Sequence, residues 1–181
     1  IVPLTGENRV LARYGLAHLN QTESVGLKAL IDVSGLRGDV DAYHIGFMLA
    51  PRLNAAGRLG DAHAALELLM TDDLARARDL AFQLDAANRE RQDLEARIVR
   101  EATDEINSFF DPTSDFGLVL ARRDWHPGVV GIVASRLTSQ YRRPVVIISL
   151  DEDGTGRGSC RSVEGFNLVE NLTRCAAWLT R

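Results

Sequence analysis

The fold is decided by the stretch that runs Trp125-His126-Pro127-Gly128-Val129-Val130-Gly131-Ile132-Val133-Ala134-Ser135-Arg136-Leu137. Proline is favoured at a helix start, because the N–H that it lacks has no partner there, and the pattern that follows predicts a helix over residues 128–141. Residues 116–120 before it and residues 144–150 after it are short apolar runs typical of strands. Strand, helix and strand in this order predict an α/β unit.

This α/β unit continues toward the C-terminus and is preceded by helical segments. A turn at residues 151–154 leads to a third predicted strand at residues 156–162, and residues from 167 onward have a helix pattern. Upstream, residues 6–70 have the pattern of short helices broken by Gly and Pro. The predicted fold class is therefore α/β: a helical segment, a long connecting helix and a small, incomplete α/β domain.

The long connecting helix is predicted over residues 71–111. The Thr71 hydroxyl can cap its first turn, and Asp111-Pro112 ends it. Residues 88–92 are polar on every side, a profile typical of a solvated strut between two packed bodies. A long coiled coil is the alternative, but apolar heptads do not continue through the middle. The predicted division of the chain is residues 1–70, 71–111 and 112–181.

Both ends have the pattern of an excised piece. The chain opens with Ile1-Val2-Pro3-Leu4 rather than Met. It closes within a helix pattern, with no stop signal, formed by Leu168, Leu172, Ala176 and Leu179. We therefore expect an interior piece of a longer protein.

Composition favours a folded cytoplasmic protein. The chain has 181 residues, of which 45% are hydrophobic and 25% charged, enough for one sizeable domain or two small ones. Its apolar runs are too short to cross a membrane. Cys160 and Cys175 do not form a Cys-x-x-Cys pair, which disfavours a thiolate zinc site or a disulfide framework.

The charge of the chain is uneven along its length. Residues 1–111 carry 12 basic and 18 acidic groups, a net charge of −6, whereas residues 112–181 carry 9 and 7, a net charge of +2. The last third is therefore the predicted anion-binding part. All basic residues except Lys28 are Arg, whose guanidinium suits bidentate phosphate contacts. A GC-rich coding bias is the alternative explanation.

Three groups of residues are candidates for anion binding. The first is the helix start at His126 and Gly128, where small residues leave the amides of the first turn bare for an anion. His126 can donate to that anion or cap the helix. Alternatively, Gly128 and Gly131 permit close packing of the helix against a strand.

The second group lies on the third predicted strand. Arg157, Ser159 and Arg161 share one face at period two, and Gly158 lets a phosphate approach the backbone. The alternative is a solvated edge hairpin. Cys160 lies on the other face and is predicted to pack rather than react.

The third group is Arg52, Asn54 and Arg58, in a stretch with Pro51 and Gly57 that is predicted to be a turn. Alternatively, its polar side chains tie loop carbonyls to neighbouring helices. The four histidines, in contrast, have no spacing typical of a metal site. Three of them are predicted in surface or cap roles: His18, His44 and His63.

Five ordered motifs together resemble the bacterial RecJ-type exonucleases of the DHH phosphoesterase superfamily. They span nearly the whole chain and are Pro3-Leu4-x-Gly6-Glu7-Asn8-Arg9, Gly46-Phe47-x-x-Ala50-Pro51-Arg52-x-Asn54-Ala55-Ala56-Gly57-Arg58, Asn88-Arg89-x-Arg91-Gln92, Trp125-His126-Pro127-Gly128-Val129-Val130-Gly131-Ile132 and Gly158-Ser159-x-Arg161-Ser162.

The resemblance implies a parent enzyme that degrades single-stranded DNA from its 5′ end in DNA repair and recombination. In such enzymes a DHH lobe holds two divalent metals, Mn²⁺ or Mg²⁺, that activate water, and a long helix leads to a DHH-associated lobe that closes over a single-strand groove. Here residues 1–70 would be the C-terminal part of the DHH lobe and residues 112–181 the N-terminal part of the associated domain. The metal ligands would lie upstream, so the fragment alone is expected to bind no metal and to be inactive.

The resemblance also implies roles for individual residues. Ser159 and Arg161 are expected to contact the DNA backbone at the 5′-terminal phosphate, and Cys160 departs from the alanine common between them. His126 and the amides after it would face the catalytic cleft, opposite Arg52, Asn54 and Arg58. Expected partners are single-stranded DNA, a helicase and a single-strand-binding protein.

Two other functions remain open from the sequence. The first is an enzyme of the same superfamily that acts on short RNA oligonucleotides or cyclic dinucleotides. The length of the connecting helix argues against it, because a dinucleotide does not need such a large separation between lobes. The second is a partner-docking module whose Arg-rich face binds an acidic protein.

Overall fold

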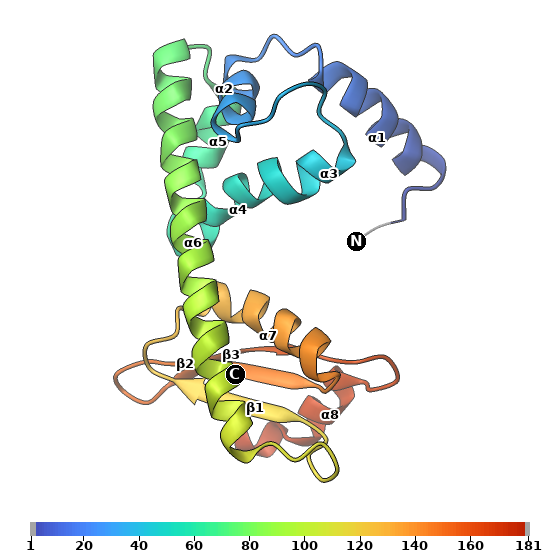
Figure 1. Ribbon diagram of the computed structural model, residues 1–181, viewed down its shortest axis with the longest axis vertical. Coiled ribbons are helices and arrows are strands. Elements are labelled where there is room, and N and C mark those ends of the chain that lie inside the picture. Colours follow the sequence, from blue (N-terminus) through green and yellow to red (C-terminus); the bar gives the residue numbers. More distant parts are fainter. Residues whose placement is uncertain (1–2, 180–181) are drawn as a thin grey trace. The chain divides into compact units, whose positions relative to one another are not determined.

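The computed structural model describes residues 3–179 and groups the chain into two compact units, residues 1–91 and residues 92–181 (Figure 1). Helix α6 (Leu74–Phe109) contributes its first half to one unit and its second half to the other. The division at residues 70 and 111 stays a prediction. Within residues 3–179, no helix is both long and apolar enough to span a membrane.

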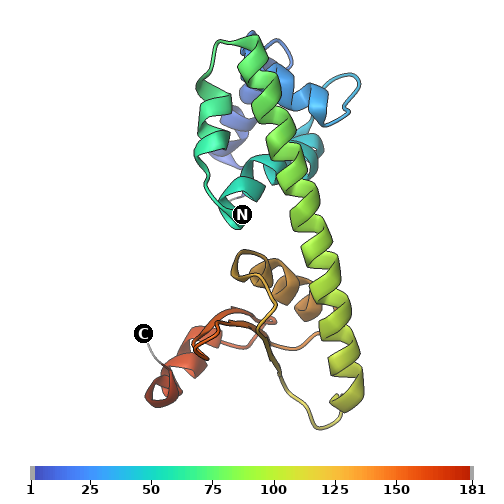
Figure 2. The ribbon, with the colours of Figure 1, turned by 90° about the vertical axis from the view of Figure 1, so that its left-hand side faces the viewer.

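The first unit is built from helices, as the sequence predicts. They are α1 (Gly6–Leu19), α2 (Val25–Val33), α3 (Ala42–His44), the π-helix η1 (Ile45–Leu49), α4 (Ala50–Leu59), α5 (His63–Met70) and the first half of α6. Figure 2 shows α5 alongside that half of α6. Leu30 on α2, Leu68 on α5 and Leu84 on α6 pack in one core. Helix α2 approaches α5 at Gly26, where a Cβ would collide with the Leu68 carbonyl.

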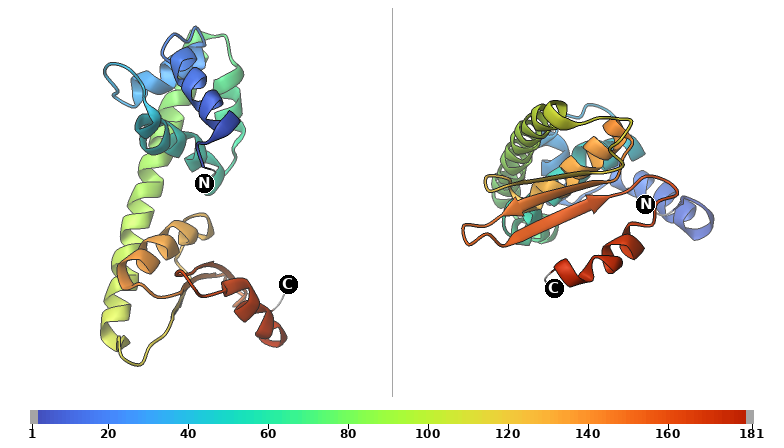
Figure 3. Two further views of the ribbon diagram at one scale, coloured as in Figure 1. Left: turned by 90° about the vertical axis from the view of Figure 1, so that its right-hand side faces the viewer. Right: turned by 90° about the horizontal axis from the view of Figure 1, so that it is seen from below.

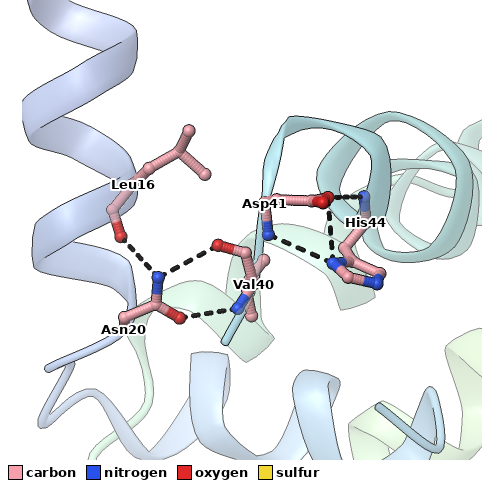
Figure 4. A network of polar contacts seen from close by, with 5 residues as sticks. All are labelled: Leu16, Asn20, Val40, Asp41 and His44. Carbon is pink, nitrogen blue, oxygen red and sulfur yellow. Dashed lines mark hydrogen bonds and ion pairs between the residues drawn. The ribbon is translucent and has the colours of Figure 1, made fainter. Parts of the chain in front are cut away.

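Polar contacts fix the loop between α2 and α3 (Figure 4). The Asn20 side chain donates to the carbonyls of Leu16 (3.2 Å) and Val40 (3.0 Å) and accepts from the Val40 N–H (2.7 Å). Asp41 and His44 then form a capping box: the His44 N–H donates to Asp41 Oδ1 (2.9 Å), and the Asp41 N–H donates to His44 Nδ1 (3.1 Å). His44 therefore has the cap role that its position predicts.

Helix α6 differs from its prediction at its start and in its middle. The Asp73 carboxylate caps it by accepting from the Ala75 and Arg76 N–H groups (2.8 and 3.2 Å), whereas Thr71 Oγ1 accepts from the Asp73 N–H, which lies before the first turn. The middle is not solvated on every side, because Asn88 is 3% exposed. That prediction is wrong because a neighbouring arginine satisfies Asn88: Arg91 donates to its Oδ1 (2.9 Å).

The second unit is the predicted α/β unit. It contains β1 (Leu118–Arg122), α7 (Pro127–Tyr141), β2 (Val145–Leu150), β3 (Gly156–Arg161), α8 (Leu168–Arg174) and the 3₁₀ turn η2 (Ala176–Trp178). The sheet has the order β1-β2-β3, with β1 parallel and β3 antiparallel to β2. Helix α7 connects the two parallel strands and packs on β2 and β3 (Figure 3).

The core of this unit lies between α7, the sheet and the second half of α6. Val129 and Leu137 on α7, Ile147 on β2 and Ile98 on α6 are fully buried. Trp125 is 1% exposed. Its indole Nε1 donates to Glu101 on α6 (2.8 Å), and its carbonyl accepts from Ser149 Oγ on β2 (2.6 Å). Trp125 thus fixes the chain immediately before α7.

The last helix is shorter than its apolar pattern predicts. Helix α8 is capped by Asn167, whose Oδ1 accepts from the Glu170 N–H (3.1 Å), but it ends at Arg174. Leu179 has an extended backbone, so the expectation of a helix still continuing at this point is wrong. The first strand is also displaced, since β1 begins at Leu118 rather than at residue 116.

Candidate nucleic-acid interface

A guanidinium and two hydroxyls meet between α7 and β3. Arg161, the last residue of β3, donates from Nε to Ser135 Oγ on α7 (2.9 Å) and from Nη1 to Ser159 Oγ (3.0 Å). Nη1 also donates to the Cys160 carbonyl (2.7 Å). Arg161 is exposed, so its guanidinium is held in a fixed position and is still accessible to a ligand.

Helix α7 comes this close to β3 because Gly131 has no side chain. A Cβ at this position would lie 3.0 Å from Ser159 Oγ and 3.4 Å from Arg161 Nη2. One turn later, Ser135 Oγ donates to the Gly131 carbonyl (3.1 Å) while it accepts from Arg161. Gly131 therefore permits close packing of α7 against β3, which is one of the two interpretations of the glycines in this stretch.

The start of α7 is capped by its own preceding residue. The Gly128 N–H donates to His126 Nδ1 (3.1 Å), and the N–H groups of Val129 and Val130 donate to the His126 carbonyl (3.0 and 3.2 Å). The prediction of bare amides is wrong here, because the imidazole and the carbonyl satisfy them. Contact of His126 and Gly128 with nucleic acid stays a prediction.

Arg157 lies on the same side of β3 as Ser159 and Arg161. These three residues pair in the sheet with Ser149, Ile147 and Val145 of β2, which are the buried, helix-facing positions of that strand. Cys160 pairs with Val146 on the opposite face. The predicted alternation of β3 is therefore confirmed. Arg157 is exposed and lies near the start of the strand, next to Gly156.

The stretch with Pro51 is a helix and not the predicted turn. Residues Ala50–Leu59 form α4, which continues directly from the π-helix η1. Pro51 lies at the junction of η1 and α4, where it has no N–H to donate to the preceding turn, and the helix continues through it. The small side chains of Ala55 and Ala56 are buried and allow the helix to pack closely.

Within α4, the three predicted site residues do not form one cluster. Arg52 faces α6, where its Nε donates to Asp85 Oδ1 (2.9 Å), and its Nη1 donates to the Met48 carbonyl (2.6 Å). Asn54 and Arg58 are exposed and lie one turn apart on another face of the helix. The structure thus brings Asn54 and Arg58 together and separates Arg52 from them.

Two supporting residues escaped the sequence analysis. Ser135 lies inside the quoted α7 stretch, and its signal is the spacing of four residues from Gly131, which places both on the face that meets β3. Asp85 accepts from Arg52 on α4 and from Arg89 on its own helix (2.7 Å). Its signal is the i,i+4 spacing to Arg89.

Metal ligands are not gathered anywhere in the described part of the chain. Among residues 3–179, no group of three or more His, Cys, Asp and Glu side chains could hold a metal ion. Coordination of a divalent metal needs several such groups around one point, so these residues do not fit a metal centre.

The Cys160 thiol is predicted to react slowly. Burial raises its pKa above the ordinary value, although the charge of Arg161 acts in the opposite direction, and the thiolate is the reactive form. Cys175 is exposed. We therefore expect iodoacetamide near neutral pH to alkylate Cys175 well before Cys160, with Cys160 labelling increasing as the pH is raised. Peptide mass spectrometry of a time course measures both rates, and equal rates would contradict the burial of Cys160.

Known proteins with similar sequences and structures show which proteins this chain is related to. The DHHA1 domain family matches residues 115–179, which contain the sheet, α7 and α8. RecJ of Bacillus subtilis, a single-stranded-DNA-specific exonuclease, is 43% identical over 178 residues, which is 97% of this chain and 22% of that protein. RecJ of Escherichia coli is 38% identical over 179 residues, 96% of this chain and 31% of that protein.

A solved structure agrees over the whole chain. The crystal structure of RecJ from Thermus thermophilus in complex with Mg²⁺ matches with a TM-score of 0.87 at 39% identity, and the match covers 100% of this chain and 27% of that one. The chain is homologous to this region of RecJ. Compared with the RecJ relatives, it spans about a quarter of their length, from 22% to 31%. The α/β fold, with a long helix before the DHHA1 domain, is thus the RecJ fold of this region.

Proposed function

We propose that the chain supplies nucleic-acid-binding surface to a metal-dependent, single-strand-specific 5′→3′ DNA exonuclease. The observation that carries this proposal is the Arg161 guanidinium fixed by Ser135 and Ser159 beside Gly131. The names of the RecJ relatives, which are single-stranded-DNA-specific exonucleases, support the choice of substrate. In this proposal residues 1–70 belong to the DHH lobe, residues 71–111 connect, and residues 112–181 begin the associated domain.

The chemistry of the β3 cluster suits a phosphate. A guanidinium presents several N–H donors in one plane and no acceptor, and the Ser159 hydroxyl adds a further donor, whereas the Ser135 hydroxyl already donates to the Gly131 carbonyl. Contacts of this kind position a strand without selecting a base. We propose that Ser159 and Arg161 bind the 5′-terminal phosphate and that Arg157 binds the adjacent backbone.

The other predicted contacts complete the proposed wall of the single-strand groove. They are Asn54 and Arg58 on the exposed face of α4, Arg52 on the face of α4 that meets α6, and His126 with Gly128 at the start of α7. The proposed biological setting is DNA repair and recombination in the cytoplasm, with a helicase and a single-strand-binding protein as further partners.

Hydrolysis is assigned to none of the described residues. In the solved relatives, RecJ is found in complex with Mg²⁺ or Mn²⁺, and two divalent ions can activate water and stabilise the leaving oxygen. Residues 3–179 offer no ligand set for such ions. The role proposed for this chain is therefore to bind and orient the strand.

We expect the 181-residue chain to bind short single-stranded DNA with an affinity that falls as salt increases, by about 0.7 in log–log slope for each phosphate neutralised. Fluorescence anisotropy with a 3′-labelled oligonucleotide measures this. The 5′-phosphorylated strand should bind several-fold more tightly than the 5′-hydroxyl strand, and a blunt duplex should bind more weakly. No cleavage is expected with Mn²⁺ or Mg²⁺.

Three outcomes would contradict the proposal. Binding that ignores both salt and the 5′ phosphate would remove the phosphate site. Equal affinity for an acidic protein with nucleic acid absent would favour a docking module. Metal-dependent cleavage by the pure chain would show that the hydrolytic residues lie within it.

A further inference from the structure

A buried carboxylate joins two arginines within the first unit. Asp85 on α6 is 4% exposed. Its Oδ1 accepts from Arg52 Nε on α4 (2.9 Å), and its Oδ2 accepts from Arg89 Nη2 on the next turn of α6 (2.7 Å). Two guanidiniums therefore share one carboxylate, which leaves one positive charge in excess.

The two arginines are in different environments. The Arg52 side chain is 15% exposed and is also tied to the Met48 carbonyl, so it neutralises Asp85 inside the protein. The Arg89 side chain is 75% exposed. The excess charge thus belongs to Arg89 at the surface. Its guanidinium is anchored through Nη2 to the buried Asp85 carboxylate.

We infer that Arg89 is a phosphate contact for the nucleic-acid backbone and that Asp85 is the positioning residue that holds it. This inference rests on the proposed function and deepens it, because neither residue belongs to the β3 cluster or to the α4 residues proposed above. A free surface arginine loses side-chain freedom when it binds. Because Asp85 already restrains the Arg89 side chain, less conformational freedom is lost on binding. The other N–H donors of Arg89 can then donate to the phosphate.

The simpler alternative is that the three residues only tie α4 to α6. Removal of the Asp85 charge separates the two ideas by the sign of its effect on binding. If charge alone matters, Asp85→Asn makes the surface more positive and tightens binding to DNA. If Asp85 positions Arg89, the same variant weakens binding, because the amide holds the guanidinium less firmly than the carboxylate does.

The test measures binding of 5′-phosphorylated single-stranded DNA to the full chain by anisotropy. Arg89→Ala should weaken binding about fivefold to tenfold and make the salt dependence shallower by about one phosphate. Asp85→Asn should weaken it about threefold or more, and should have no further effect when Arg89 is already Ala, because the two residues act as one unit. Arg89→Ala leaves the buried Arg52–Asp85 pair intact, so it remains informative if Asp85→Asn unfolds.

Matched controls come from the same helix. Arg100 and Glu90 are exposed, so Arg100→Ala removes one positive charge and Glu90→Gln one negative charge without touching Asp85. The first should weaken binding less than Arg89→Ala does, and the second should leave it unchanged or tighter. Tighter binding by Asp85→Asn, or equal effects of Arg89→Ala and Arg100→Ala, overturns the inference. If the Arg89 inference fails but Arg161→Ala still weakens binding, the proposed function stands. If binding by the wild-type chain does not depend on salt, the proposed function itself fails.

Discussion

Replacement of Arg161 by alanine is expected to weaken binding of single-stranded DNA by about 10-fold to 100-fold. A hydrogen bond to a charged group contributes about 1.5–3 kcal/mol, and about 1.4 kcal/mol corresponds to a factor of ten. The loss should be uniform across sequences, because a backbone contact carries no base information. Anisotropy titrations at several salt concentrations measure the affinity and its salt slope together.

Two further variants show whether geometry or charge is responsible. Arg161→Lys keeps the charge but loses the planar fork that Ser135 and Ser159 hold, so we expect it to bind nearly as weakly as the alanine variant. Arg174→Ala removes one exposed positive charge from α8, where Arg174 pairs only with Glu170 in the described residues, and should have little effect. Full affinity in Arg161→Ala is incompatible with the proposed phosphate site.

The second large effect concerns stability. Trp125→Ala is expected to destabilise the second unit by about 3–5 kcal/mol, the usual range for removing a buried aromatic side chain. Trp125 is 1% exposed, and Glu101 loses the indole donor as well. For a unit of this size the melting temperature should fall by at least about 12 °C. Circular dichroism or calorimetry measures this shift.

The chain provides its own control for this experiment. Trp178, the other tryptophan, is 81% exposed, so Trp178→Ala should leave the melting temperature almost unchanged. In that variant Trp125 is the remaining tryptophan, and blue-shifted fluorescence would show that its indole is buried. If both variants melt alike, Trp125 is not the core residue described above.

Much of the second unit was predictable, because its signals are local. Pro127 marks the start of α7, and the apolar run at residues 145–150 marks a buried strand. The alternation of a strand is enough to place Ser159 and Arg161 on one face and Cys160 on the other. The contact of Arg161 with Ser135 was not predictable, because it depends on where α7 packs across the sheet.

The first unit was harder to predict, because tertiary contacts override local signals there. Pro51 suggested a turn, yet Ala55 and Ala56 bury a continuous helix against the core. The polar residues at the middle of α6 suggested a solvated strut, yet Asp85 and Asn88 are buried. Their burial is compatible with stability because they have partners: Arg89 and Arg91 lie within one turn on α6, whereas Arg52 comes from α4, a contact that the sequence alone does not indicate.

The most direct test of the account is an NMR titration of the labelled chain with a 5′-phosphorylated oligonucleotide, followed through backbone amide shifts and arginine Nε–H signals. The account predicts that the largest changes occur at Ser159 and Arg161 on β3 and at Gly131 on the facing turn of α7, and that they diminish when the 5′ phosphate is removed. Changes that avoid this cluster, or that are identical with and without the phosphate, would contradict it.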